Sequence, residues 1–351
     1  MEECMQANTQ VKPVNQSLYK YDLFTSLPQN SERVKEARRR KNQETYTSYK
    51  LLLEEFERAS GYDLTLAKSI LATVDPASRL NPSFHAAAHR AKEAMIVGDA
   101  LECFRALKWI ETAKHTVSHS GIQVFSPNGT LACCEAVTHI HQDQTLDVHG
   151  RRAEIFHTTQ DEIAPYTKEF QQALALLKFA DEDMHAETIE LISQVTIFKA
   201  QAIMGGSLNR TFGAIFIASP DHDPIRGHSA YLTHRGVPYF LEHLVHESSH
   251  NVLFGLMLSD PMVLNPVSEK FSAPLRTDLR PMYGIFHAAF VVARMVRVFK
   301  LMVRKGRPEY QRLVDHFEPR LINGIRVVSE HGKLTPNGKR FFESFAQCGL
   351  L

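Results

Sequence analysis

Apolar residues recur at helical spacing over most of this 351-residue chain, and this periodicity limits the folds that it can adopt. After a polar N-terminal stretch, the pattern begins at Ser31 and returns over residues 91–113, 161–178 and 184–201. The C-terminal part repeats it over residues 238–259, 282–304, 309–329 and 338–348. We therefore expect a mainly α-helical protein.

One stretch breaks the helical pattern. Between Gly121 and Thr159, short alternating segments at residues 122–125, 136–141, 146–148 and 153–157 are separated by turn residues. A single strand-like run follows at Phe212–Ile217. These segments predict a small antiparallel β-sheet within an α+β fold. We expect an N-terminal helical region over residues 1–120 and a catalytic region over residues 121–351, packed as one compact unit because no Gly/Ser-rich linker separates them.

The charge and cysteine content exclude several classes of protein. With 40 Lys and Arg against 39 Asp and Glu, the net charge of +1 gives no basic field for a nucleic acid or an anionic membrane. Five cysteines without CxxC spacing favour neither a disulfide framework nor a thiolate zinc site. The N-terminus lacks the basic and apolar regions of a signal peptide, and Arg294, Arg297 and Lys300 interrupt the richest apolar run, residues 288–303. We predict a cytoplasmic protein, and the sequence predicts no particular oligomeric state.

Histidine is abundant, with 18 residues, and one pair of histidines has a specific spacing. The run His246-Glu247-Ser248-Ser249-His250 is an HExxH motif. On a helix, residues four apart lie about 40° apart around the axis, so both imidazoles can reach one metal ion. Pro238 suits the first turn of such a helix, and the motif follows the strand-like run 212–217, where HExxH enzymes commonly keep an edge strand for peptide binding. The simpler interpretation is a pair of buried histidines without a metal.

Other histidines allow weaker hypotheses. His85 and His89 also lie four residues apart, but no carboxylate accompanies them. His139, His141 and Asp143 alternate on a predicted strand, in the HxD form of jelly-roll oxygenases. That fold needs about eight strands, which this chain does not offer. His222, His228 and His234 fall in a loop and are expected at the surface or in a pocket wall.

A metal held by His246 and His250 needs at least one more protein ligand. Glu269 follows His250 at the interval seen in some HExxH peptidases, although its neighbours read as an exposed loop. His287 is the rival, because Gly284 and nearby alanines would let its helix approach the HExxH helix closely. Arg276 and Arg280 lie between the two and could bind the carboxylate of a small molecule.

Four runs in order carry a resemblance to a known family: residues 244–250, 258–266, 274–282 and 284–291. They resemble the HExxH-type peptide-modification proteins, which are associated with gene clusters for ribosomally made, post-translationally modified peptides. The match is dense over about Gly213–Arg297, roughly a quarter of the chain. Members of this family are regarded as 2-oxoglutarate-dependent peptide β-hydroxylases.

The resemblance implies iron(II) rather than zinc, with His246, His250 and His287 at the positions of the family's histidines. It further implies 2-oxoglutarate and dioxygen as co-substrates, a precursor peptide as partner, and Arg276 and Arg280 as candidates for binding the oxoglutarate carboxylate. Three protein ligands would leave three positions of an octahedron for a bidentate 2-oxo acid and dioxygen.

The role of Glu247, our candidate catalytic residue, stays open between orienting a ligand and holding a water. Two alternatives to the oxygenase also stay open. One is a zinc metallopeptidase with Glu247 as general base and Glu269 as third ligand. The other is a peptide-binding scaffold without catalytic activity.

Overall fold

The computed structural model describes residues 22–29, 31–117, 121–142, 150–221, 235–273 and 279–350. Within these ranges the α-helices are α1 (Glu32–Ser60), α2 (Thr65–Leu71), α3 (Pro82–Val97), α4 (Ala100–Thr112), α5 (Leu131–Gln142), α6 (Gln160–Ala180), α7 (Glu182–Leu191), α9 (Val237–Met257), α10 (Met282–Arg304), α11 (Gln311–His331) and α12 (Pro336–Gly349). The strands are β1 (Gln123–Phe125), β2 (Glu154–Phe156), β3 (Gln194–Gln201), β4 (Gly205–Gly206), β5 (Ala214–Ala218), β6 (Lys270–Ser272) and β7 (Leu279–Pro281). The predicted class, mainly α with little β, is confirmed.

The N-terminal helices form a core of their own. Side chains from α1 to α4 pack together between Tyr49 and Ile110, and the Tyr49 hydroxyl donates to the backbone carbonyl oxygens of Ala106 and Leu107 at 3.0 Å. Side-chain caps define where two of these helices begin, since Asn81 accepts from the Ser83 amide and Asp99 from the Glu102 amide. Only the first turns of α1 join the main core, through Val34 and Ala37.

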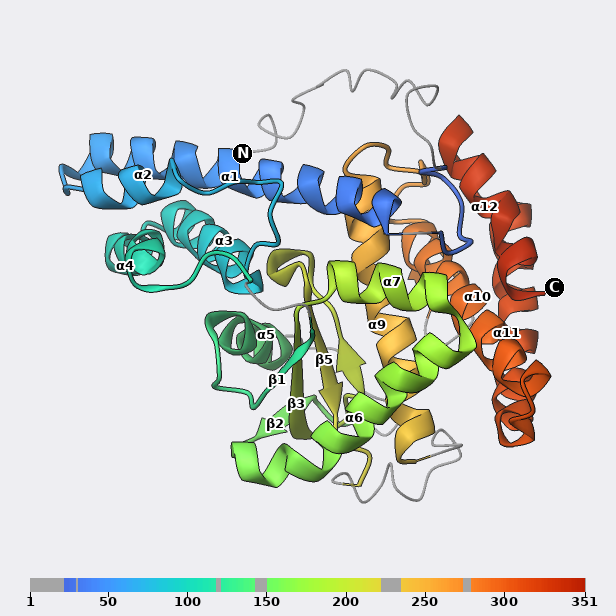
Figure 1. The fold of residues 1–351 in the computed structure, drawn as a ribbon. Helices are drawn as coiled ribbons and strands as arrows, with labels where there is room; N and C mark the ends of the chain where they lie inside the picture. The colour runs from blue at the N-terminus through green and yellow to red at the C-terminus, as the bar shows by residue number, and fades with distance from the viewer. Residues whose placement is uncertain are drawn as a thin grey trace.

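The main sheet has the strand order β1-β3-β5-β4, with β2 pairing with β3 beyond β1. Strands β1, β3 and β5 are parallel, whereas β2 and β4 are antiparallel to their neighbours, so the sheet is mixed rather than antiparallel as predicted. Figure 1 shows α5 on one side of this sheet and α6 and α9 on the other. β5 has a neighbour on each side and is therefore not the edge strand that we expected.

Two local predictions were wrong. Residues 136–141 belong to helix α5 instead of a strand, because Ala132, Ala136 and Ile140 place a buried stripe at helical spacing. Conversely, the helix predicted over 184–201 ends at Leu191, and the rest is the central strand β3. Most of β3 is buried on both faces, including the polar Gln194 and Thr196, so it lacks the regular apolar–polar alternation that identifies a half-buried strand.

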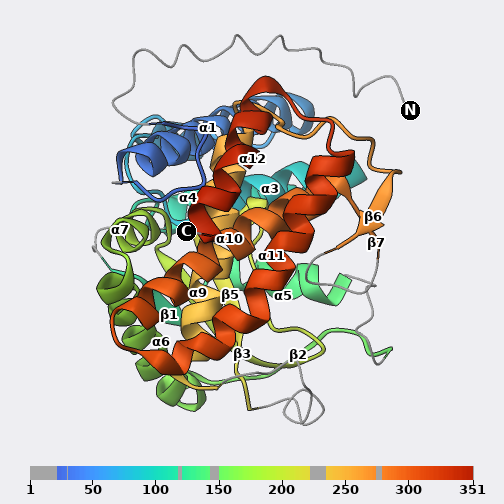
Figure 2. The same ribbon diagram turned by 90° about the vertical axis from the view of Figure 1, so that its right-hand side faces the viewer.

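Helix α10 is the axis of the C-terminal part. It has the bounds predicted from the sequence, Met282–Arg304, and most of its side chains are buried. It packs against α9, α11 and α12, and Figure 2 shows α11 and α12 over its outer side. The predicted packing of the HExxH helix on a second long helix is therefore present, since α9 contains the motif. No helix in the described ranges has both the length and the apolar character that crossing a membrane requires.

A buried charge cluster connects the helical layers. The Glu187 carboxylate, on α7, accepts from Arg33 of α1 at 2.5 Å and from Arg294 of α10 at 2.7 Å. All three side chains are almost fully buried, with exposed fractions of 0 to 1%. The Gln29 amide donates to the same carboxylate, and Arg294 donates to the Ser26 carbonyl, so the segment before α1 is held as well.

We expect Glu187→Ala to lower the free energy of unfolding by about 3–5 kcal/mol, because it leaves two buried guanidinium groups without their carboxylate. The control is Glu330→Ala, which removes an exposed pair with Arg326 and should cost less than about 1 kcal/mol. Urea unfolding monitored by circular dichroism measures both changes. Equal losses in the two variants would contradict the structural role of the cluster.

Candidate metal centre

Helix α9 presents the HExxH motif at the centre of the molecule. It spans Val237–Met257, with a proline in its first turn as the sequence predicted, and it contacts β4 and β5 as well as α6 and α10. Because it is packed on several sides, most of its side chains are buried. The motif therefore lies on a rigid element, which suits a site that must hold its ligands in a fixed geometry.

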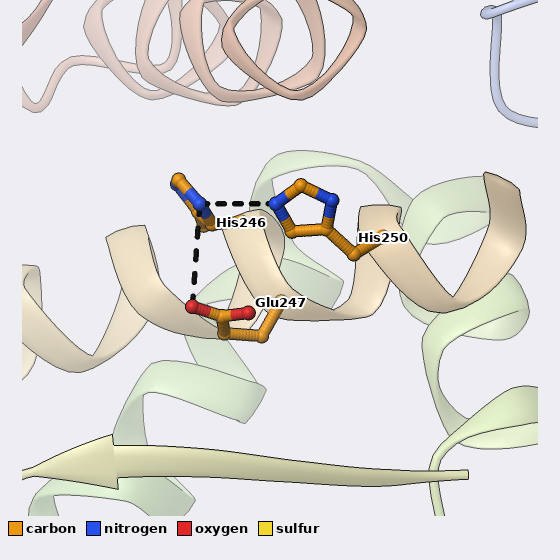
Figure 3. A group of neighbouring side chains, drawn as sticks. All are labelled: His246, Glu247 and His250. Atoms are coloured by element: carbon orange, nitrogen blue, oxygen red, sulfur yellow. Dashed lines mark hydrogen bonds and ion pairs between the residues drawn. The ribbon is translucent and has the colours of Figure 1, made fainter. Parts of the chain in front are cut away.

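His246 and His250 face each other on one side of α9, as Figure 3 shows. Their Nε2 atoms are 3.3 Å apart. Two nitrogen donors at about 2.1 Å from one ion span this distance when the angle at the ion is about 105°, which is close to tetrahedral and within reach of an octahedral site. The spacing of the two donors therefore fits a shared first-row metal ion.

Glu247 completes the group of potential ligands. Its Oε1 lies 4.0 Å from His246 Nε2, and its Oε2 accepts a hydrogen bond from Ser207 Oγ at 2.9 Å. Ligand atoms of His246, Glu247 and His250 all lie within 4.8 Å of one another, and these three form the one such group among the described residues. Burial raises the pKa of the Glu247 carboxyl to about 8, although the Ser207 hydrogen bond opposes this shift.

Strand β4 lies against the Glu247 carboxylate. A Cβ atom at Gly205 would lie 2.8 Å from the Phe216 carbonyl oxygen and 3.1 Å from Glu247 Oε1, so a larger residue would displace the carboxylate. At Gly206 a Cβ atom would meet nothing within 4 Å. Gly205 and Ser207 were not among the predicted site residues, and the local feature that could have indicated them is the Gly205-Gly206-Ser207 run.

The histidines of the site are held in the neutral form that binds metals. Removal from solvent lowers the pKa of His246 to about 4 and that of His287 to about 3. The pKa of His250 is also well below its ordinary value, first through burial and then through the neighbouring His246 and His287. His246 keeps an exposed side-chain fraction of 25%, so the pair is accessible from one side.

His287 lies beside the pair but outside the group of three. On α10, its ring centroid is 5.7 Å from that of His250, and the two rings are nearly parallel at 28°. Its Nε2 is 3.1 Å from the Met257 sulfur, and the Tyr283 ring lies against it, with the ring centroids 4.1 Å apart and the planes tilted by 40°. The structure thus brings His287 next to the motif from a different helix.

Of the two predicted arginines, the structure describes Arg280. It lies in β7, and its Cβ is 3.8 Å from the position that a Cβ of Gly284 would take, which places it at the start of α10. His287 lies on α10, seven residues after Arg280. Arg276 lies outside the described residues.

Glu269, the rival third ligand, is engaged elsewhere. Its carboxylate accepts from Lys333 Nζ at 2.9 Å and from the Asn265 side chain at 3.0 Å, and these contacts lower its pKa. It does not belong to the group around His246 and His250. The exposed loop predicted around Glu269 agrees with its side-chain exposure of 36%.

The other histidines have separate environments. His85 is buried, and its Nδ1 is 2.8 Å from Thr45 Oγ1. His139 and His141 lie on helix α5, so their predicted alternation along a strand was wrong. Asp143, His222, His228 and His234 lie outside the described residues.

A scan against protein-family models finds no match to this chain, and a search of the curated proteins finds none either. The resemblance to the HExxH-type peptide-modification proteins therefore stays a prediction from the residues that carry it.

We expect the protein to bind about one iron(II) ion per chain, and His246→Ala and His250→Ala each to lose most of this ion because each removes one of the donors 3.3 Å apart. His157→Ala, at an exposed position away from α9, is the control and should keep it. Metal analysis after anaerobic loading and desalting measures the stoichiometry. Retention of the ion by both site variants would contradict the centre.

We also expect Glu247→Gln to become more stabilising as the pH rises. In the metal-free wild type, the folded state keeps the Glu247 proton up to about pH 8, whereas the unfolded state releases it near the ordinary pKa of 4.5. The stability contribution of this proton is therefore full below pH 4.5 and is lost as the pH rises to 8, by ~1.4 kcal/mol for each unit of raised pKa. Glutamine keeps an acceptor for Ser207 and carries no charge.

Urea unfolding of both proteins in EDTA at pH 5, 7 and 9 measures this difference. A gap between variant and wild type that stays constant with pH would show that the Glu247 carboxyl has an ordinary pKa.

Proposed function

We propose that this protein is an iron(II)- and 2-oxoglutarate-dependent oxygenase that hydroxylates the β-carbon of a residue in a ribosomally made precursor peptide. The observation that carries the proposal is the His246–His250 pair, with Nε2 atoms 3.3 Å apart on a buried helix and His287 next to it. The reaction class is suggested by the resemblance of residues Gly213–Arg297 to the HExxH-type peptide-modification proteins.

The residues present fit the ion. His246 and His250 would hold it, and His287 is the third ligand in this proposal because its ring is neutral, buried and next to His250. When bound, iron(II) would supply open positions for a 2-oxo acid and dioxygen, and with them the oxidation. Neutral ligands leave the charge of the ion uncompensated, which favours an anionic co-substrate.

Arg280 would bind the distal carboxylate of 2-oxoglutarate in this proposal. It lies in β7, which directly precedes α10, and His287 follows seven residues later, so in this proposal the dicarboxylate extends from the metal ligands toward its guanidinium group. A guanidinium group can bind a carboxylate through two parallel hydrogen bonds, which fixes its orientation as well as its position. Arg276 would serve the same purpose in this proposal.

Glu247 acts in this proposal as a positioning residue. Ser207 and the space left by Gly205 hold its carboxyl group beside His246, and burial favours its protonated form. A protonated carboxyl can donate a hydrogen bond to a ligand or a water at the centre, and an ionised carboxylate can accept one.

The peptide would bind along β4. This two-residue strand is the last in the main order of described strands, and its Gly205 lies against Glu247. An extended segment that added to β4 would run past Glu247, the neighbour of His246. We also place the protein in the cytoplasm, in agreement with the free thiols of the four described cysteines.

The second candidate is a zinc peptidase, which is favoured by the presence of Glu247 in the same group as the two histidines. A peptidase would use the ionised Glu247 to take a proton from water, and it would need neither oxygen nor an oxo acid. Glu247→Gln should abolish a peptidase and leave an oxygenase with part of its activity.

The oxygenase is tested by anaerobic loading with iron(II) and 2-oxoglutarate, followed by addition of oxygen and a panel of synthetic peptides. We expect succinate to form and a peptide to gain one oxygen atom by mass spectrometry. Arg280→Ala should weaken 2-oxoglutarate binding roughly 10- to 100-fold, since a charge-assisted hydrogen bond contributes about 1.5–3 kcal/mol. Arg326→Ala, which removes an exposed arginine, is the control.

Two further variants decide the third ligand. His287→Ala should lose succinate formation, and Glu269→Ala should keep it because Glu269 is bound to Lys333 and Asn265. The absence of succinate, together with cleavage of a peptide by the zinc-loaded protein, would exclude the oxygenase in favour of the peptidase.

A further inference from the structure

Strand β4 has one residue whose backbone hydrogen-bonding groups point out of the sheet. In the antiparallel pair with β5, Gly205 lies opposite Ile217. One position earlier in the chain, the Met204 carbonyl oxygen accepts from the Ala218 amide at 2.9 Å. Opposite residues of an antiparallel pair alternate between pairs that exchange hydrogen bonds and pairs whose N–H and C=O groups point away from each other. Gly205 belongs to the second kind, so its N–H and C=O groups face the outer edge of β4.

This outer edge has no neighbouring strand among the described residues. β4 is the last strand in the main order of the sheet, and no backbone hydrogen bond from another described element reaches Gly205. The residue is half-buried rather than enclosed. A donor and an acceptor side by side on a free sheet edge match the C=O and N–H groups of one residue in an extended chain. Gly205 therefore offers two hydrogen bonds to one residue of a bound peptide.

The same residue faces the metal centre. A Cβ atom at Gly205 would lie 3.1 Å from Glu247 Oε1 and 3.3 Å from His243 Cδ2, so α9 covers this face of β4. Glu247 Oε1 is in turn 4.0 Å from His246 Nε2. Side chains of directly opposite residues in an antiparallel pair lie on the same face of a sheet. The side chain of a peptide residue opposite Gly205 would project toward Glu247 and His246, and its two neighbours would project to the other face.

We propose that an extended peptide binds antiparallel to β4 with the residue to be modified directly opposite Gly205. This inference rests on the proposed oxygenase, and it adds which residue of the peptide reaches the centre. Gly205 would donate to the carbonyl oxygen of that residue and accept from its amide. We assign the antiparallel direction because both bonds then join the same two residues, whereas the bonds of a parallel pair are slanted and the pairing is slightly less stable.

This register makes side-chain selection alternate along the peptide. Gly205 has no side chain, so the space beside Glu247 is left for the side chain of the residue to be modified. On the other face, a Cβ atom at Gly206 would meet nothing within 4 Å, so this part of the surface does not restrict the neighbouring peptide residues. We therefore expect the site to select its peptide through the backbone and through the residue opposite Gly205.

The test uses the metal-free, full-length protein and short acetylated peptides selected from a random synthetic library for binding to it. In each selected peptide the backbone nitrogens are methylated one at a time, and fluorescence anisotropy measures the affinity. We expect methylation at one residue to weaken binding about 10-fold, because the Gly205 carbonyl oxygen then loses its donor. Methylation of either neighbouring residue should weaken binding far less, since those N–H groups point away from β4.

Amide hydrogen exchange locates the bound peptide on the protein. The Gly205 amide has no partner in the free sheet, so we expect its exchange to slow when a selected peptide binds. The Gly206 amide is the internal control, because it points toward β5 and its exchange should not respond.

Cobalt(II) in the centre then identifies the peptide residue that faces it. We expect paramagnetic relaxation to be fastest for the side-chain protons of the residue whose N-methylation weakens binding. A parallel peptide would instead place these two effects on adjacent residues. That result, an unchanged exchange rate at Gly205, or equal sensitivity of adjacent peptide nitrogens would each overturn the proposal. Slowed exchange at Gly205 together with an absence of succinate formation would keep the peptide register and reject the oxygenase.

Discussion

The buried carboxylate of Glu187 is the contact on which the arrangement of the helices depends. It joins α1, α7 and α10 through Arg33 and Arg294, and it accepts from the backbone of Gln29. A buried ion pair of this kind adds little net stability compared with apolar packing, but it allows few alternative arrangements, because any shift leaves a charge unpaired. It therefore acts mainly by specifying how three helices pack.

This specification reaches the candidate metal centre through α10. His287 and Arg294 lie seven residues apart, which is about two helical turns, so they occupy the same side of the helix. The contact between Arg294 and Glu187 therefore fixes both the rotation of α10 and its position along its axis. Helix α9 alone brings His246 and His250 together. A site that includes His287 also requires the correct register between α9 and α10.

The sequence predicted the parts of this arrangement that depend on local pattern. The bounds of α10 and the spacing of His246 and His250 follow from helical periodicity and a motif. Strand β3 was missed because it is buried on both faces and Phe198 follows Ile197, so apolar and polar residues do not alternate regularly along it. Ser207 was missed because its contact with Glu247 joins residues 40 positions apart, which no local pattern encodes.

The environment of Glu247 connects metal binding with protonation. In the metal-free protein, burial holds the proton on this carboxyl group up to about pH 8. A divalent ion between His246 and His250 would lie within a few ångströms of Glu247, and its positive charge would favour the ionised form. Uptake of the ion at neutral pH is then coupled to release of a proton, and its affinity rises with pH. The same burial that raises the pKa of Glu247 thus makes the charge of the centre depend on its metal.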